Sequence, residues 1–283
     1  MRTVILANHK GGVGKSAVAT LLAQYWHRQR HRVLAIDLDH QGNFSSTITL
    51  SKRASVASIT ADKLLTTPKA ELTPDQFVLV PAGDGLLGLE RQPALHTTFA
   101  RNLRDLLKAV DHQFDVCVID TQPNPDIRLI AALATGDFVI CPIQLNQEAI
   151  DGVRALLHHP RMGLHKIKSV LNPKLHCIGL LPTLVESTPF QRANFLQIVQ
   201  RYHPLLIRIG DGPGDFASIP RRSSIAEAQA HGEVLWEMKK TAAREAWKEI
   251  EPTLRALAGI VTGQQQARSH ASSQPGAGHD TAA

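Results

Sequence analysis

The segment that decides the fold runs from residue 3 to residue 16 and reads TVILANHKGGVGKS. Residues 3–8 form an apolar run typical of a buried strand, and a glycine-rich turn then leads into residues 17–30, whose apolar residues recur at helical spacing. The backbone N–H groups of such a turn can point at phosphate oxygens, while a lysine neutralises the phosphates and a hydroxyl binds Mg²⁺. The segment therefore predicts a phosphate-binding loop for ATP and Mg²⁺.

The loop carries two lysines. Lys15 is the lysine expected against the phosphates and Ser16 the hydroxyl expected on Mg²⁺, whereas His9 occupies the position of the usual first glycine and Lys10 adds a second cation. This loop resembles the deviant Walker A motif of the ParA/MinD family of ATPases. The predicted nucleotide-binding residues of the loop are Lys10, Gly11, Gly12, Val13, Gly14, Lys15, Ser16 and Ala17.

The resemblance implies a role for Lys10 in a second subunit. In the family, the extra lysine reaches across an ATP-dependent, nucleotide-sandwich homodimer to the partner's phosphates. Lys10 would then add positive charge where negative charge develops during phosphoryl transfer, so both Lys10 and Lys15 are predicted to be catalytic. The alternative is that Lys10 is a solvated lysine near a phosphate.

Apolar runs alternate with helical patterns along the chain. The predicted strands are residues 3–8, 33–37, 77–81, 116–120, 137–143 and 176–185, and the predicted helices are residues 17–30, 99–110, 127–134, 148–157 and 190–202. Such alternation favours parallel strands joined by crossover helices. We therefore expect an α/β fold, a three-layer and mostly parallel sheet flanked by helices, of the P-loop NTPase type with a deviant Walker A loop. Residues 50–74 predict a loop with one short helix, and residues 210–215 a turn-rich loop.

An acidic segment ends the second predicted strand. Residues 37–43 read DLDHQGN and resemble the D-x-D-P-Q-G-N segment of the family, with His40 in place of proline. The resemblance implies that Asp39 orients the attacking water near the γ-phosphate, which makes it the third predicted catalytic residue. Capping of a helix is the alternative for such a cluster. Its position at the carboxyl end of a strand, where ligands bind in these sheets, favours the functional role.

A second acid, Asp120, ends the apolar strand 116–120. This is the Walker B arrangement, in which the acid holds Mg²⁺ directly or through a bound water. Ser16 and Asp120 are therefore the predicted metal ligands.

The resemblance extends over residues 1–258. Near its end, residues 219–221 (IPR) and 226–232 (AEAQAHG) resemble the segment that packs beside the adenine base. Pro220 would then contact the base, and a proline that starts a helix is the alternative. Ser224 stands where many partition ATPases have a basic residue for DNA, and Arg222 is expected to replace it.

The chain is basic, with a net charge of +6 and a pI near 9.4, which favours a polyanionic partner. Within the family, a ParA-type, Soj-like DNA-partition ATPase is the predicted function. ATP would close a dimer that binds DNA without sequence preference, and a centromere-binding ParB-type partner would stimulate slow hydrolysis and release. A related ATPase that positions another cargo stays open. The predicted DNA contacts are Arg221 and Arg222 beside the nucleotide and Lys239, Lys240 and Arg244 on the final helix; solvated side chains are the alternative.

Two further functions are disfavoured. A MinD-like membrane regulator needs a C-terminal amphipathic helix, but large apolar residues are absent after Val261, so no membrane contact is expected. An electron-transfer ATPase resembling the nitrogenase iron protein needs cysteines at the dimer face. Cys117, Cys141 and Cys177 lie in predicted buried strands, which predicts neither a cluster nor a disulfide.

The predicted organisation is a single P-loop ATPase domain over residues 1–258, followed by a disordered tail over residues 259–283 that is rich in Gln, Ser, Gly, His and Ala. No signal peptide and no membrane-length apolar stretch is recognised, which predicts a cytoplasmic, nucleoid-associated protein. Because the first strand begins almost at Met1, an N-terminal DNA-binding extension is not expected.

Overall fold

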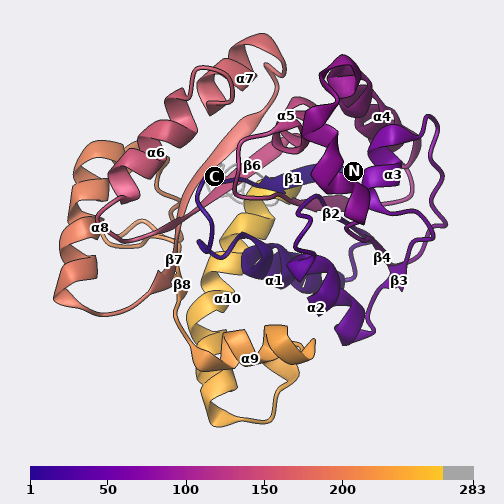
Figure 1. The fold of residues 1–283 in the computed structure, drawn as a ribbon. Coiled ribbons are helices and arrows are strands. Elements are labelled where there is room, and N and C mark those ends of the chain that lie inside the picture. Colours follow the sequence, from indigo (N-terminus) through magenta and orange to yellow (C-terminus); the bar gives the residue numbers. More distant parts are fainter. Residues whose placement is uncertain (264–283) are drawn as a thin grey trace, which may run out of the picture.

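A computed structural model describes residues 1–263 and shows one sheet covered by helices on both faces (Figure 1). The eight strands follow the order β3-β4-β2-β5-β1-β6-β7-β8, and each neighbouring pair is parallel. The predicted three-layer α/β class is therefore confirmed. The strands are β1 (Arg2–Leu6), β2 (Val33–Asp37), β3 (Ser55–Val56), β4 (Phe77–Val80), β5 (Val116–Asp120), β6 (Phe138–Gln144), β7 (His176–Val185) and β8 (Ile219–Pro220).

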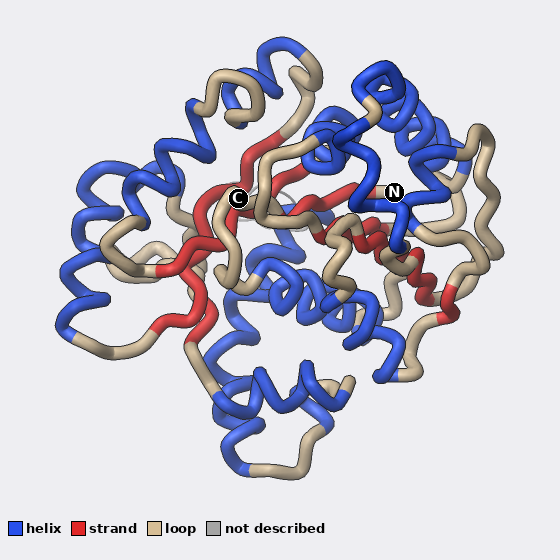
Figure 2. The backbone as a smooth tube through the Cα atoms, in the orientation of Figure 1, coloured by secondary structure: helices blue, strands red, loops and turns tan. Residues whose placement is uncertain are grey.

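Helices connect the strands and alternate with them along the chain (Figure 2). The α-helices are α1 (Lys15–Arg28), α2 (Asn43–Ser51), α3 (Ala61–Thr66), α4 (His96–Ala109), α5 (Ile127–Thr135), α6 (Ala149–His158), α7 (Leu164–Val170), α8 (Pro189–Tyr202), α9 (Ser223–His231) and α10 (Thr241–Thr262). Four 3-10 helices complete the described chain: η1 (Asp84–Arg91), η2 (Pro93–Leu95), η3 (His203–Leu205) and η4 (Leu235–Glu237).

The core consists of two layers, one on each face of the sheet. Side chains of a strand point alternately to opposite faces, and in β1 Val4 and Leu6 pack against α1, α2, α9 and α10. Ile5 faces the other way and packs in the cluster that contains α3 to α8. Because both faces are covered, the central strands read as continuous apolar runs, which is why they could be recognised in the sequence.

The carboxyl ends of three central strands meet at one level of the sheet. In the parallel register, Asp120 of β5 lies opposite Leu6 of β1 on one side and opposite Asp37 of β2 on the other. The chain leaves β1 at this level and enters α1 through residues 7–14. The glycine-rich turn and two strand-end carboxylates are thereby brought to the same edge.

The predicted strands and helices are all present, and their ends differ from the prediction by a few residues. Sequence reasoning missed the short helices α2, α7 and α9 and the two-residue strands β3 and β8, because elements of this length show no clear period. Between residues 50 and 74 the one short helix is α3, as expected, and residues 210–215 form turns. Pro220 lies in β8 and α9 begins at Ser223, so the alternative of a helix-starting proline is wrong.

The predicted tail begins too early. Helix α10 continues to Thr262, and Val261 is buried against the core, so residues 259–262 belong to the folded domain. The rest of that prediction, residues 264–283, lies outside the described residues. Of the cysteines, Cys117 and Cys141 are buried and Cys177 is half-buried, and all three are free thiols. Within residues 1–263, no helix is both long and apolar enough to span a bilayer.

Two glycines that end helices allow a test of the fold. Gly232 (φ +66°) ends α9, and a Cβ there would lie 2.5 Å from the backbone of Leu50 and Ser51, whereas Gly263 (φ +76°) ends α10 in open space. We expect Gly232→Ala to lower the free energy of unfolding by about 2–5 kcal/mol, because a left-handed conformation and a backbone clash both oppose alanine. Gly263→Ala, the matched control, should cost about 1–2 kcal/mol. Urea unfolding measures both, and equal losses would contradict the close packing of α9 on α2.

Candidate nucleotide-binding site

The phosphate loop lines a cavity of about 570 Å³ at the carboxyl edge of the sheet. Gly12 and Gly14 have φ values of +70° and +80°, which other residues adopt only with strain, so the turn needs glycine at both positions. Gly14 is also the N-cap of α1, which directs the N-terminus of that helix at the cavity. The loop and α1 lie together with residues of α2 and α9: the cavity is lined by residues 11–17, Asp39, Gln41, Asn43, Ser46, Thr47, Pro123, Leu184, Gln229 and Ala230.

Lys15 lies under the loop rather than in solvent. Its residue is 6% exposed, and its Nζ donates to the carbonyl oxygen of Lys10 at 3.1 Å. Burial lowers the pKa of Lys15, while the nearby carboxylates Asp120 and Asp39 act in the opposite direction. The ammonium group is therefore held at the cavity by the loop itself.

Lys10 points to another element of its own subunit. Its Nζ lies 2.5 Å from Oε2 of Glu148, the residue that precedes α6, and both side chains are accessible to solvent. Lys10 lowers the pKa of the Glu148 carboxyl. Its backbone N–H donates to Asn8 Oδ1 at 2.9 Å, which sets the start of the turn. Lys10 therefore lies beside the phosphate loop and pairs with Glu148, an interaction that the sequence did not predict.

Asp120 is fully buried, and neither of its carboxylate oxygens accepts a hydrogen bond from the described residues. Burial, and then the charge of Asp37, raise the pKa of Asp120 well above its usual range, while the neighbouring Ser16 hydroxyl and Lys15 oppose the rise. A buried carboxylate without a partner is costly and suits a cation. Because Mg²⁺ is commonly bound by one or two protein oxygens together with phosphates, Ser16 and Asp120 fit that ion.

The two acids of the segment after β2 have different surroundings. Asp37 accepts hydrogen bonds from the backbone N–H and the hydroxyl of Ser45, at 2.8 and 2.7 Å, and from the N–H of Asp39 at 3.0 Å. Burial raises the pKa of Asp37 to about 6 despite these bonds. Asp39 lines the cavity, and the N-cap of α2 is Gly42, so the alternative of helix capping by Asp39 is wrong.

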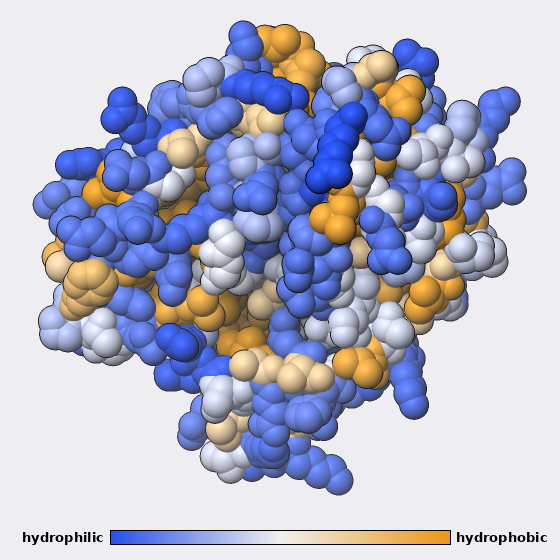
Figure 3. Space-filling model, viewed as in Figure 1, coloured by the Kyte–Doolittle hydropathy of each residue, from blue (hydrophilic) through white to orange (hydrophobic). Residues whose placement is uncertain are grey.

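A second cavity, of about 550 Å³, continues from the first and shares Gly14, Ala17, Leu184 and Gln229 with it. It is lined by Pro220 together with apolar residues that include Val18, Ile219 and Ile225. Figure 3 shows apolar side chains in the hollow between the body of the molecule and the lower lobe that contains α9. The structure thus brings Pro220 to a cavity beside the phosphate loop, as the resemblance implied.

Sequence reasoning missed two polar residues of this region. Thr183, buried in β7, donates from Oγ1 to the carbonyl oxygen of Val13 at 2.7 Å and so supports the loop from beneath. Gln229 of α9 donates from Nε2 to the carbonyl oxygen of Ala17 at 3.2 Å. A threonine near the end of an apolar strand is the signal that could have identified the first.

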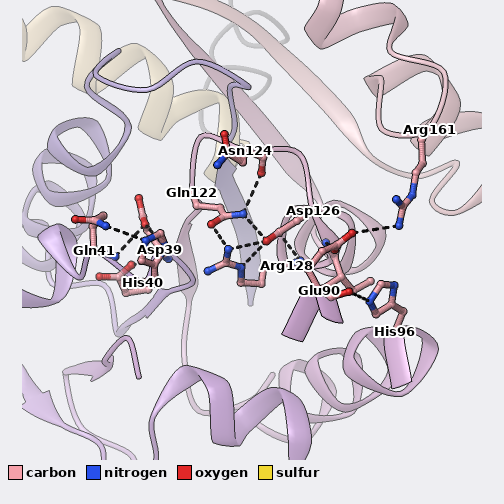
Figure 4. Close-up of polar contacts among 12 residues, drawn as sticks. Asp39, His40, Gln41, Glu90, His96, Gln122, Asn124, Asp126, Arg128 and Arg161 are labelled. Atoms are coloured by element: carbon pink, nitrogen blue, oxygen red, sulfur yellow. Dashed lines mark hydrogen bonds and ion pairs between the residues drawn. The ribbon is translucent and has the colours of Figure 1, made fainter. Parts of the chain in front are cut away.

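The segment after Asp120 is held by a buried polar network (Figure 4). Arg128 of α5 is 4% exposed, and its guanidinium donates to Asp126 Oδ2 through Nε at 2.8 Å and Nη2 at 2.6 Å. Gln122 bonds to both of these side chains, and Asp126 also caps α5 by accepting the N–H of Arg128 at 2.9 Å. Pro123, between these residues, packs at the phosphate loop near Gly11. The network therefore fixes the segment that joins the candidate metal ligand to α5.

A second part of Figure 4 links the start of α5 to more distant segments. Glu90 of η1 accepts the backbone N–H of Ile127 through Oε2 at 2.7 Å, and its Oε1 lies 3.5 Å from Arg161. His96 contacts the Glu90 carbonyl at 3.3 Å. Both ends of the segment from residue 121 to residue 127 are thus tied to the body of the protein.

None of the predicted DNA-contacting cations lines the phosphate-loop cavity, although Arg221 and Arg222 line the second cavity beside Pro220, and most of the five have acidic partners. Arg221 pairs with Glu186 at 3.7 Å, Arg222 with Glu249 at 2.8 Å, and Lys240 with Glu227. The placement of Lys239 and Lys240 on the final helix is wrong, because both precede α10, with Lys240 at its N-cap. Arg244 lies on the first turns of α10 and donates to the Thr241 hydroxyl at 3.4 Å.

The parallel sheet and the glycine loop between β1 and α1 define the class of P-loop nucleotide-binding proteins, and comparisons with known proteins narrow it. A family model described as an AAA domain matches residues 1–177. IncC from Escherichia coli is 34% identical over 278 residues, which cover 92% of this chain and 69% of IncC. The chromosome-partitioning ATPase Soj from Thermus thermophilus is 32% identical over 237 residues, covering 83% of this chain and 87% of Soj.

Among solved structures, an ATP complex of McdA from Cyanothece has a TM-score of 0.69 at 21% identity and covers 91% of this chain and 96% of McdA, a likeness that shows the fold. The chain therefore belongs to the AAA-domain family and, within it, to the ParA-type partition ATPases represented by Soj. The resemblance stated from the loop residues is confirmed.

The buried network around Arg128 yields a prediction for stability. Arg128→Met should lower the free energy of unfolding by about 3–5 kcal/mol, because it leaves Asp126 buried without its cationic partner. The double variant Asp126→Ser with Arg128→Met removes the orphaned charge and keeps an N-cap, so it should recover at least half of that loss. Urea unfolding of parent, single and double variants measures both. A double variant as unstable as the single one would contradict an ionic role for the network.

Proposed function

We propose that the chain is a Mg²⁺-dependent ATPase whose ATP-bound homodimer binds DNA without sequence preference, and that a centromere-binding ParB-type partner stimulates hydrolysis and release. The observation that carries the proposal is the pair of lysines at one phosphate loop. Lys15 is buried at the cavity, and Lys10 stands at its rim, held only by an exposed carboxylate. This arrangement supports a role for Lys15 at its own nucleotide and for Lys10 at the nucleotide of a second subunit.

In this proposal each residue of the site has a separate task. The N–H groups of residues 11–16 and the Lys15 ammonium would bind the phosphates, and the base would occupy the cavity beside Pro220. Ser16 and Asp120 would hold Mg²⁺, which neutralises charge on the phosphates when it is bound. Asp39, whose side chain lines the cavity, would orient the attacking water.

Phosphoryl transfer gains most from positioned charge, because its transition state spreads negative charge over the phosphate oxygens. Lys10 of a second subunit would add such charge only once the dimer has formed. Before that, Glu148 keeps Lys10 paired in its own subunit. We infer that closing of the dimer exchanges Glu148 for a phosphate, which ties turnover to dimerisation.

Binding of DNA by the dimer would rest on phosphate contacts of exposed cations, and Arg221, Arg222, Lys239, Lys240 and Arg244 stay proposals for that role. Three of them would have to exchange a carboxylate partner for a phosphate. Such contacts carry no sequence information and weaken as salt displaces the protein from the DNA counterions. A cytoplasmic, nucleoid-associated location would follow from this binding.

The pairing of Lys10 with Glu148 predicts how dimerisation responds to substitution. Glu148→Gln should lower the protein concentration needed for the ATP-dependent dimer, because Lys10 no longer has an anionic partner in its own subunit. Lys10→Ala should raise that concentration and remove dimer-dependent hydrolysis. Sedimentation velocity with and without ATP measures the dimer, and Glu71→Gln, which neutralises an exposed carboxylate elsewhere, is the control. If Glu148→Gln dimerises like the parent, Glu148 does not restrain Lys10.

A DNA-binding assay tests the proposed function as a whole. We expect a duplex of arbitrary sequence to be shifted by the chain with ATP, but not with ADP or without nucleotide, and the affinity to fall steeply with salt. The logarithmic slope should be about 0.9 per phosphate contacted. Lys15→Ala should abolish the ATP-dependent part because the nucleotide loses its buried cation. Binding that is indifferent to nucleotide would overturn the coupling between ATP and DNA.

A further inference from the structure

A third cavity, of about 210 Å³, lies at the far end of α1 from the phosphate loop. It is rich in cations: three arginines line it together with a single carboxylate. The lining residues are Gln24, His27, Arg28, Arg30, Arg53, Val234, Trp236 and Glu237. None of these residues takes part in the nucleotide site, so the cavity is a separate feature of the fold.

Two residues that line this cavity, Gln24 and His27, have buried polar atoms without a partner among the described residues. Gln24 is 4% exposed, and its amide nitrogen Nε2 is buried and has no hydrogen-bond partner among the described residues. A buried donor without an acceptor costs about 1–3 kcal/mol, and native proteins pair the great majority of such groups. Gln24 lines the cavity, so an acceptor bound there would satisfy this donor once the buried amide turns toward the ligand.

Two of the three arginines, Arg28 and Arg53, are held in place by contacts within the protein. The Arg28 guanidinium lies 5.2 Å from the ring centre of Trp236 and 5.1 Å from that of Trp247, and this contact with two indoles restricts its motion. Arg53 pairs with Glu237. Among residues 1–263, neither Arg28 nor Arg30 has a carboxylate within ion-pair distance, so their charges are not neutralised.

The backbone at Arg30 also indicates a constrained position. Its φ is +68°, a left-handed conformation that costs energy in a residue with a Cβ. Glycine or asparagine would suit this turn better, yet the position carries a cation that lines the cavity. The His31 N–H donates to the Trp26 carbonyl oxygen at 3.1 Å, so Arg30 occupies the left-handed position of a common helix end.

The cavity is continuous with a basic strip of the surface. A neighbouring cavity of about 480 Å³ shares Arg53, Val234 and Glu237 with it and extends to Lys239 and Lys240. Figure 1 shows the elements involved side by side: α1 and α2 lie above the lobe that contains α9. Cations therefore line a path from Arg30 to Lys240.

We propose that the cavity formed by Gln24, Arg28, Arg30 and Arg53 binds a phosphate group. Fixed guanidinium groups and an unpartnered amide donor match the oxygens of a tetrahedral oxyanion, and the small volume admits a phosphate rather than a nucleotide. The phosphate can come from the DNA backbone or from free inorganic phosphate. The first source rests on the proposed function, and the second does not.

The test uses the full chain saturated with a non-hydrolysable ATP analogue, which fills the phosphate loop. Inorganic phosphate is then titrated and followed by calorimetry and by the NMR signals of the Gln24 side-chain amide. Arg30→Asn removes the cation while asparagine tolerates the left-handed turn. Lys69→Asn is the matched control, because Lys69 is an exposed cation with φ +55° that lies outside the cavity. Both variants change the net charge equally.

We expect Arg30→Asn to weaken phosphate binding about tenfold or more, as the loss of a charged hydrogen bond implies, and Lys69→Asn to leave it unchanged. Gln24→Leu should also weaken binding and should raise the stability of the phosphate-free protein, because it removes the orphaned donor. Absence of saturable phosphate binding, or an equal effect of Arg30→Asn and Lys69→Asn, would overturn the site.

A second arm identifies the source of the phosphate. If Arg30→Asn weakens DNA binding by the ATP-bound protein more than Lys69→Asn does, the cavity receives a backbone phosphate. If the two variants bind DNA alike while only Arg30→Asn loses inorganic phosphate, the ligand is free phosphate. A chain that binds no DNA at all would contradict the proposed function and leave the calorimetric result intact.

Discussion

The parallel register of β1, β2 and β5 is the constraint on which the rest of the site depends. It places Asp37 and Asp120 side by side at the strand ends and brings the glycine loop to the same level. Burial raises the pKa of both carboxyls, and the charge of Asp37 raises the pKa of Asp120 further. If stability were the only requirement, two adjacent buried carboxylates would be unfavourable. The buried ammonium of Lys15 and the open cavity indicate that the cost is tolerated because this edge must receive a cation and an anion together.

The fold and the centre of the site could be predicted from the sequence because both depend on local patterns. The apolar runs of the central strands are continuous since both faces of the sheet are buried, and the spacing of glycines in residues 10–16 defines the turn without any distant contact. The acids at the ends of β2 and β5 could be assigned because parallel strands end at a common edge. Short elements such as α7 and β8 were not predicted, because they contain too few residues to show a hydrophobic period.

Contacts between distant residues could not be predicted. Lys10 and Glu148 are 138 positions apart, and neither segment contains a pattern that predicts their ion pair. The partners of the cations expected to contact DNA could not be predicted either. The composition gives the number of charges but does not show which carboxylates lie beside them in the fold. In the structure, Arg222 and Lys240 are each paired with a glutamate. A net charge therefore says little about where a polyanion binds, because a surface attracts phosphate through cations that lack an internal partner. Within residues 1–263, Arg28 and Arg30 meet that condition, as do Lys239 and Arg244, whereas Arg221, Arg222 and Lys240 are paired.

Helix α1 explains why its two ends would bind phosphate with different chemistry. At the N-terminus, the helix dipole and free backbone N–H groups favour an anion, so a glycine backbone and the single cation Lys15 would be sufficient within one subunit. At the C-terminus the dipole is reversed, and the carbonyl groups of the last turn repel an anion. A phosphate bound at this end therefore needs several cationic side chains that packing holds close together. Three arginines, one of which lies against two neighbouring tryptophans and one of which has a left-handed backbone, meet that need, and the polarity of one helix is consistent with the composition of both cavities.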